Sequence, residues 1–318
     1  MGQMIQIQSD SDFLERGQTY EIPIVVELDK PLKRVRNVTA QFHAAERAEA
    51  EYTVTVTDSE GDTKTETRTA VAYHTIVKED FILHGGPSAG FFRGLGDSVA
   101  TMFGGGSSGT LSAGRHEFSV GVTIPENAPP SMEGKICEVF YKLSVRIDRA
   151  LARDPKENKS FTVVPVAQQL DPQPVVARYP DEENTGFWAR TFGRKANLTL
   201  VISADSFVPG DELECMFGVE TESPMKIRAA KARILCIEKT RADGHTDSST
   251  HCSKDFTIAD KQTIDDQFST RFVLPLESIG PPTTGGHVFD IDWYVEVTLD
   301  VPWATDPVIR APIQVVFP

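Results

Sequence analysis

Short runs of β-branched and aromatic residues, often alternating with polar ones, recur along the whole chain. Gly, Pro, Asn or Asp bound most of them, and these residues end strands and form turns. The runs cover residues 22–28, 35–42, 52–57, 117–124, 139–147 and 161–164, and then 198–203, 213–219, 227–238, 268–274, 288–301 and 313–317. The alternation predicts antiparallel strands with one buried face. Since no helical period separates them, it favours β-sandwiches over a sheet with crossover helices.

Two segments between such runs have the composition of hairpin turns. Residues 58–62 read DSEGD, and residues 242–245 read ADGH. Each contains a glycine, which adopts positive φ without strain. We therefore expect an antiparallel hairpin around each segment.

The pattern occurs twice along the chain, with the closing parts about 150 residues apart. The first copy contains Phe13, Gly17, Phe118, Ile124-Pro125, Pro129-Pro130, Gly134, Phe140-Tyr141, Asp154-Pro155 and Val163-Val164-Pro165. The second contains Phe207, Gly210, Phe272, Leu274-Pro275, Pro281-Pro282, Gly286, Trp293-Tyr294, Asp306-Pro307 and Val315-Val316-Phe317-Pro318. Two long copies in 318 residues predict two similar domains rather than a solenoid. We expect the first domain over residues 1–167, a linker over 168–196 and the second domain over 197–318.

The first copy is longer than the second, mainly through a glycine- and serine-rich insert at 85–114. Within it, large apolar residues recur at helical spacing, which predicts a short amphipathic helix. One interpretation is a helix packed on the outside of the first sandwich, and another is a mobile element that docks on a partner or a bilayer. Disorder is a third, because Gly94 and Gly96 weaken a helix. The candidate contact residues here are Phe91, Phe92, Leu95, Val99 and Met102.

The expected linker combines a proline-rich part with a basic and aromatic part. The prolines favour an extended connection. The basic and aromatic residues either hold the linker in the crevice between the domains or contact phosphate, lipid or an acidic partner. These second candidate contact residues are Phe187, Trp188, Arg190, Phe192, Arg194 and Lys195.

The net charge of −14 opposes general binding to nucleic acid or to an anionic membrane, so any membrane contact has to be local. The chain has neither a long apolar window nor the features of a secretory signal, and we expect a cytoplasmic protein, with a peripheral location at membranes as the alternative. The four cysteines form no close pair along the sequence, which favours reduced thiols.

Several segments resemble conserved segments of the arrestin superfamily. Residues 111–120 read LSAGRHEFSV, residues 124–135 read IPENAPPSMEGK, and residues 141–149 read YKLSVRIDR. Residues 207–213, FVPGDEL, and 311–315, APIQV, are similar to the entry and exit of the family's second domain. The chain looks most like the α-arrestin, or arrestin-domain-containing, branch.

The resemblance implies two β-sandwiches of immunoglobulin-like type joined by a hinge and acting as an adaptor. Members bind cytoplasmic parts of membrane proteins and couple them to sorting machinery, and the retromer small subunit has the same architecture. Receptor arrestins also carry one amphipathic helix at the place of the insert. The chain departs from the family in two respects: it has no lysine before Lys30 to sense phosphate on the first strand, and no Tyr completes a ligase-recruiting motif after Pro130 or Pro282.

Candidate chemical sites are weak in this sequence. Residues 105–109 satisfy G-x-S-x-G, but they lie in a glycine tract without the strand and helix that a nucleophile elbow needs. The spacing of the thiols and imidazoles in Cys236, His245, His251 and Cys252 matches no ordered zinc motif. The acidic pairs Asp265-Asp266 and Asp290/Asp292 are more simply exposed residues than a catalytic dyad. We therefore expect no catalytic residue, no metal site and no cofactor.

The sequence thus predicts an all-β, non-enzymatic adaptor for protein transport or signal transduction. Its expected partners are cytoplasmic tails of membrane proteins or sorting factors, bound through sheet edges and interdomain geometry. The alternative is a structural coat or scaffold subunit, similar to the retromer small subunit, that forms a fixed protein assembly.

Overall fold

A computed structural model of the chain describes residues 3–9, 11–57, 59, 62–85, 109–164, 172–179, 196–303 and 306–316. These residues form strands and connections, and no helix occurs among them. The all-β class is confirmed. The expected short helix falls within residues 91–103, outside the described ranges.

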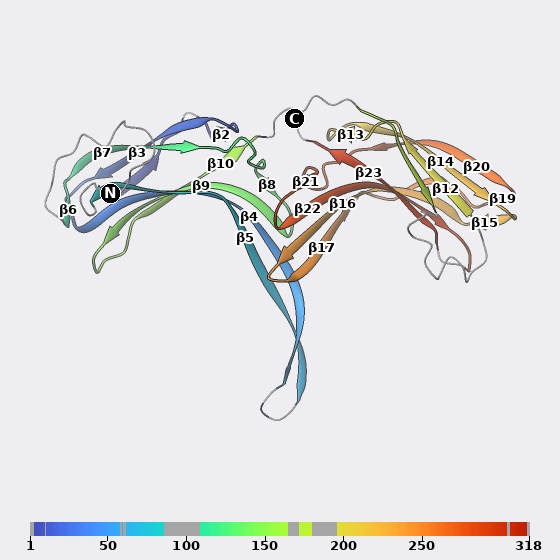
Figure 1. The fold of residues 1–318 in the computed structure, drawn as a ribbon, viewed down its shortest axis with the longest axis horizontal. Helices are drawn as coiled ribbons and strands as arrows, with labels where there is room; N and C mark the ends of the chain where they lie inside the picture. The colour runs from blue at the N-terminus through green and yellow to red at the C-terminus, as the bar shows by residue number, and fades with distance from the viewer. Residues whose placement is uncertain are drawn as a thin grey trace. The chain divides into compact units, whose positions relative to one another are not determined.

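The strands occur in two groups along the chain (Figure 1). The first group is β1 Gln3–Ile7, β2 Phe13–Leu14, β3 Thr19–Leu28, β4 Leu32–Thr57, β5 Thr63–Gly85, β6 Gly109–Leu111, β7 Gly114–Thr123, β8 Met132–Glu133, β9 Cys137–Arg149 and β10 Lys156–Val163. The second is β11 Val175–Tyr179, β12 Ala196–Ile202, β13 Ser206–Phe207, β14 Glu212–Thr221, β15 Met225–Ile227, β16 Ala229–Ala242, β17 His245–Cys252, β18 Phe256–Ala259, β19 Gln262–Ile264, β20 Gln267–Pro275, β21 Thr284–Gly285, β22 Phe289–Asp300 and β23 Val308–Val315.

The chain divides into two compact units. The first comprises Met1–Glu46, Tyr73–Ser131 and Val139–Val166, and the second comprises Arg47–Ala72, Met132–Glu138 and Ala167–Pro318. The ends of β4 and β5 that meet at their turn, and the segment around β8, therefore belong to the second unit. The sequence pattern did not indicate this exchange.

The first unit contains two sheets. The smaller has the order β1-β3-β7 and is antiparallel throughout. The larger has the order β2-β10-β9-β4-β5, and β4 and β5 continue from it into the second unit. Apolar residues at alternate strand positions form the core, and the largest fully buried side chains include Phe42 and Tyr141.

The second unit repeats this arrangement. Its smaller sheet has the order β11-β12-β14-β20 and its larger one the order β13-β23-β22-β16-β17, while β15 and β19 form a separate pair. Phe217, Phe289 and Trp293 are among its fully buried side chains. β11 lies within the segment expected as a linker, where it is an edge strand paired with β12.

The turns of the two units make equivalent hydrogen bonds, and in the closing part of each unit the equivalent residues are 152 positions apart, as Tyr141 and Trp293 are. The amide of Gly17 donates to the carbonyl of Ile124, and that of Gly210 donates to the carbonyl of Leu276, at 2.8 and 2.9 Å. Ile124 is therefore equivalent to Leu276. Pairing it with Leu274, as the sequence comparison did, was wrong by two residues.

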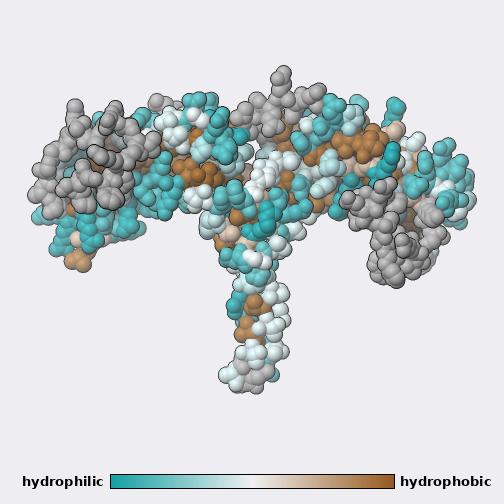
Figure 2. All heavy atoms as spheres, in the orientation of Figure 1, coloured by the Kyte–Doolittle hydropathy of each residue, from teal (hydrophilic) through white to brown (hydrophobic). Residues whose placement is uncertain are grey.

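The hairpin of β4 and β5 is longer than the sequence pattern indicated, with strands of 26 and 23 residues. Residues 43–51, HAAERAEAE, have the composition of a helix, yet Ala44, Ala48 and Ala50 are fully buried at even positions of one strand. Toward its turn the hairpin surface is mostly of intermediate hydropathy, with one apolar patch (Figure 2). β4 ends at Thr57 and β5 begins at Thr63, on either side of the expected turn at residues 58–62, and the two strands are neighbours in one sheet.

Candidate functional site

The contact residues predicted from the sequence lie outside the described residues. This applies to the five in the insert, Phe91, Phe92, Leu95, Val99 and Met102, and to the six in the linker, Phe187, Trp188, Arg190, Phe192, Arg194 and Lys195. Their role in partner or membrane contact stays a prediction. The G-x-S-x-G segment also falls there, except for its last glycine.

The cysteines and histidines of the second unit do not form a metal site in the part of the chain that the structure describes. No group of three or more His, Cys, Asp or Glu side chains in that part could hold a metal ion. Cys236 and His251 face each other across β16 and β17, whereas His245 stacks on Tyr52 at the end of the hairpin. All four cysteines are free thiols, as expected, and only Cys252 is exposed.

A buried carboxylate in the second unit organises a group of polar contacts that the sequence did not reveal. Glu238, in the middle of β16, has no exposed surface. The amides of Lys135 and Ile136 donate to its oxygens at 2.9 and 3.0 Å, and His251 Nε2 lies 2.6 Å from Oε1. We call these four residues the Glu238 clamp. It holds the turn that follows β8 against β16.

The environment of the clamp explains why a charged glutamate is tolerated there. Burial disfavours the charged carboxylate, but the hydrogen bonds from Ile136, Lys135 and His251 outweigh that effect and lower the pKa of Glu238. The same burial, together with the negative charge of Glu238, raises the pKa of the Cys137 thiol and raises that of Cys236 to about 12. Both thiols are therefore protonated and unreactive near neutral pH.

The same face of β16 and β17 also contacts the β4–β5 hairpin within the second unit. Thr240 Oγ1 donates to the carbonyl of Glu49 at 2.5 Å, and the amide of Glu51 donates to Asp247 at 3.0 Å. The rings of Tyr52 and His245 stack with centroids 3.8 Å apart. Side chains from β16 and β17 thus hold β4 at residues 49–52.

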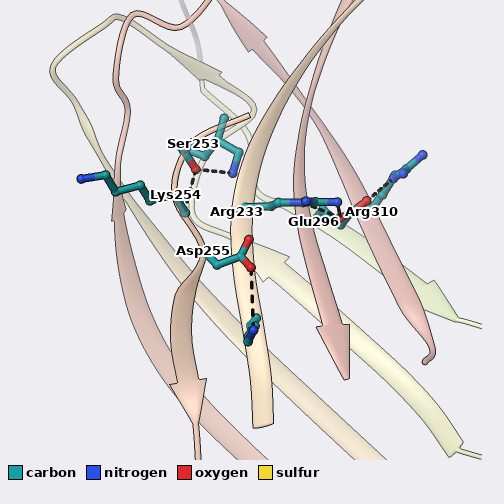
Figure 3. A network of polar contacts seen from close by, with 8 residues as sticks. Arg233, Ser253, Lys254, Asp255, Glu296 and Arg310 are labelled. Atoms are coloured by element: carbon teal, nitrogen blue, oxygen red, sulfur yellow. Dashed lines mark hydrogen bonds and ion pairs between the residues drawn. The ribbon is translucent and has the colours of Figure 1, made fainter. Parts of the chain in front are cut away.

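A charged ladder covers the opposite face of the larger sheet of the second unit. Glu296 on β22 is almost completely buried, and it lies between Arg233 and Arg310 on the two neighbouring strands (Figure 3). Each arginine approaches one of its carboxylate oxygens to 2.6 Å. Asp290 and Asp292 form ion pairs with Arg241 and Lys239 on the same face. The two aspartates are half-buried sheet residues in a charge ladder.

An apolar strip crosses the outer face of the smaller sheet of the second unit. Val176, Val201 and Met216 are direct partners across β11, β12 and β14. Val273 on β20 lies two residue pairs further along on the same face, because it faces Glu214 while Arg271 faces Met216. The exposed fractions of Val176, Met216 and Val273 are 55%, 40% and 49%. These four residues, named here the apolar strip, bring together three of the large hydrophobic side chains that remain exposed.

The strip reaches an edge of its sheet. β20 is antiparallel to β14 over nine residue pairs and is the last strand on that side in the described part of the sheet. An edge strand presents backbone N–H and C=O groups that can pair with another chain. A strand added beside β20 would place alternate side chains next to Val273 and would extend the strip.

In the part of the chain described by the structure, no helix is long and apolar enough to cross a bilayer.

No curated protein sequence matches the chain. Among solved structures, the sporulation control protein Spo0M from Bacillus subtilis is 19% identical, with a TM-score of 0.34. The similarity covers 38% of this chain and 49% of that protein, about half its length.

One family model matches the chain. It describes the N-terminal domain of arrestin, or S-antigen, and it matches residues 96–169. The matched segment contains β7, β9 and β10, which carry the motifs that resemble this family. Residues 96–169, in the first of two units that repeat each other's turns, are therefore similar to the N-terminal domain of arrestin.

Proposed function

We propose that this chain is a non-enzymatic adaptor or scaffold that binds protein partners through the apolar strip and the adjoining edge of β20. The partners are cytoplasmic parts of membrane proteins or sorting factors, and the protein acts in the cytoplasm in transport or signalling. The similarity of residues 96–169 to the N-terminal domain of arrestin supports this class of function. The observation that carries it is the apolar strip on a sheet face that is otherwise polar.

The strip suits a peptide better than a small molecule. It is an exposed row on a flat sheet, whereas small-molecule sites are concave and enclose most of their ligand. A peptide in extended conformation gains main-chain hydrogen bonds at β20, and every second side chain lies on the face of Val273 and extends the apolar strip. Arg271 and Glu214 border these apolar residues and can select the charge of the peptide.

Affinity capture with the full chain tests this proposal. We expect Met216→Asp combined with Val273→Asp, the strip variant, to lose the partners that the unchanged protein captures, because each aspartate places a charge in the buried contact. Val308→Asp is the matched control. Val308 is 36% exposed on a different strand of the same unit, so its substitution leaves the partners bound. A partner set that is the same for the strip variant and the control contradicts the proposal.

Interdomain geometry contributes to the proposed adaptor function. A partner that prefers one arrangement of the two units shifts the population toward it. Energy transfer between dyes on the two units, measured with and without a captured partner, detects that shift. The alternative function is that of a coat or scaffold subunit, and it predicts an assembly of fixed mass in light scattering. If the strip variant no longer forms that assembly, the apolar strip joins its subunits.

A further inference from the structure

The loop that joins β9 and β10 presents a leucine to solvent in an unusual backbone conformation. Leu151 is 91% exposed and has φ of 57°. The loop is fixed from both sides, because the amide of Arg149 donates to Asp154 at 2.8 Å and the amide of Ile147 donates to the carbonyl of Pro155 at 3.0 Å. Residues 149–154, named here the Leu151 tip, are therefore a well-defined loop.

The left-handed conformation costs free energy for any residue with a Cβ, and glycine or asparagine is usual there. Leu151 contributes almost nothing to the core of the first unit, since nearly all of its surface faces solvent. A leucine at this position therefore has an unfavourable backbone conformation, and no burial of its side chain offsets that cost. Such an outlier is a reason to look for a binding role.

The equivalent loop in the second unit provides an internal comparison. Trp303 is fully exposed and has φ of 61°. The loop is fixed in the same way, because the amide of Val301 donates to Asp306 at 2.9 Å and the amide of Leu299 donates to the carbonyl of Pro307 at 3.0 Å. The charges differ. Residues 145–156 contain four basic and two acidic residues, whereas residues 297–308 contain two acidic residues and no basic one.

Further basic residues surround the Leu151 tip. The amide of Ala150 donates to the carbonyl of Arg34 at 2.8 Å, which places the tip beside the first residues of β4 (Figure 1). The acidic residues of the tip region are already paired, Asp154 with Arg146 and Asp148 with Arg36. Within the described part of the chain, the ion pairs include none from the exposed basic residues Lys33, Arg34, Arg153 and Lys156.

We propose that the Leu151 tip, with Lys33, Arg34, Arg153 and Lys156 around it, docks the first unit on an anionic lipid surface. The leucine enters the boundary between headgroups and acyl chains, and the basic side chains contact the phosphates. An acidic peptide fits this site less well, because a projecting side chain offers no groove to a chain, whereas it inserts readily into a fluid bilayer. The local surplus of positive charge is complementary to anionic lipid although the whole protein carries −14.

This membrane contact goes beyond the proposed partner binding and uses a different unit of the protein. It predicts that the strip variant, which loses protein partners, still binds vesicles as the unchanged protein does. Failure of partner capture and failure of lipid docking are therefore separate results.

Co-sedimentation of the full chain with vesicles tests the proposal. We expect binding to vesicles of phosphatidylcholine mixed with phosphatidylserine, little binding to vesicles of phosphatidylcholine alone, and a loss of binding as salt is raised. Arg153→Gln weakens the binding about fivefold, since each basic residue near an anionic surface contributes a similar factor. Leu151→Gly weakens it roughly tenfold through the lost apolar insertion, while its thermal midpoint does not fall, because glycine relieves the left-handed backbone.

Trp303→Gly is the matched control, because it removes an exposed apolar side chain from the same turn where the charge is negative. It leaves vesicle binding unchanged. Three results would overturn the proposal: no binding of the unchanged protein to the anionic vesicles, equal binding by Leu151→Gly and Arg153→Gln, or an equal loss in Trp303→Gly. Capture of polyglutamate without capture by vesicles would also overturn it and would assign the tip to an acidic protein.

Discussion

Tyr141 and Trp293 hold equivalent positions in the two units, and each donates a hydrogen bond to the carbonyl of a proline twelve residues earlier. Tyr141 Oη lies 2.5 Å from the oxygen of Pro129, and Trp293 Nε1 lies 2.9 Å from that of Pro281. Both rings are buried. The carbonyls of two equivalent prolines thus accept a hydrogen bond from different aromatic residues, tyrosine in the first unit and tryptophan in the second. The proline corner is the same in both units, although the donor differs.

The corner of the first unit can be tested with Tyr141→Phe. The substitution keeps the ring and leaves the carbonyl of Pro129 without this donor, so we expect the free energy of unfolding to fall by about 1–2 kcal/mol. Urea denaturation followed by fluorescence measures the change. Tyr73→Phe, at an exposed position, is the control and leaves stability unchanged. An equal effect of the two substitutions would contradict the assigned role of the Tyr141 hydroxyl.

The Glu238 clamp predicts a larger effect. Glu238→Ala leaves the amides of Lys135 and Ile136 without their acceptor in a buried place, and we expect a loss of about 3–5 kcal/mol. His251→Ala removes one contact of the same carboxylate and costs less. A double-mutant cycle in urea measures the coupling of the pair, and additive effects would show that the histidine and the glutamate act independently.

The clamp also predicts how stability depends on pH. The pKa of Glu238 is lower in the folded protein than in the unfolded chain, because the backbone amides and His251 outweigh the effect of burial. The folded state therefore binds fewer protons, and the stabilisation is complete above the ordinary glutamate range and is lost as pH falls through the folded pKa. We expect the stability difference between the unchanged protein and Glu238→Gln to be constant from neutral pH to about pH 5 and to shrink below it. A difference that grows in acid would contradict this sign.

Two glycines near buried side chains predict intolerance of a methyl group. A Cβ on Gly134 would lie 2.6 Å from a Glu238 carboxylate oxygen, and one on Gly280 would lie 2.5 Å from the sulfur of Cys236. We expect Gly134→Ala and Gly280→Ala each to lower stability by about 1–3 kcal/mol. Gly218→Ala is the control, since its nearest neighbour would be 3.9 Å away. If the melting temperature of Gly218→Ala falls as far as those of Gly134→Ala and Gly280→Ala, the close packing around Gly134 and Gly280 is contradicted.

The sequence predicted the fold class, because strand alternation and turn chemistry are local signals. The turn at Asp243 and Gly244 was found from its composition, and both residues have positive φ, at 49° and 81°. Strand 43–51 was missed because alanine and glutamate favour helices, and only burial against distant strands makes it a strand. β11 was missed because the prolines on either side of it indicated an extended linker.

The candidate site was harder to predict than the fold. Glu238 directly follows an apolar run, and the two amides that bind it lie about 100 residues away, so no spacing along the chain identifies the clamp. The apolar strip depends on the register of four strands, which places Val176, Val201 and Met216 in one row. The exposure of Leu151 likewise depends on a backbone conformation that the sequence pattern did not indicate.

Site-specific photo-crosslinking tests the central claim most directly. A photoreactive amino acid placed at position 273, beside the edge of β20, should crosslink to a cytoplasmic segment of a membrane protein or to a sorting factor. The same amino acid at position 308 should not. Crosslinks of equal yield from both positions, or none from 273 under conditions in which partners are captured, would contradict the account of the strip and its edge as the binding site.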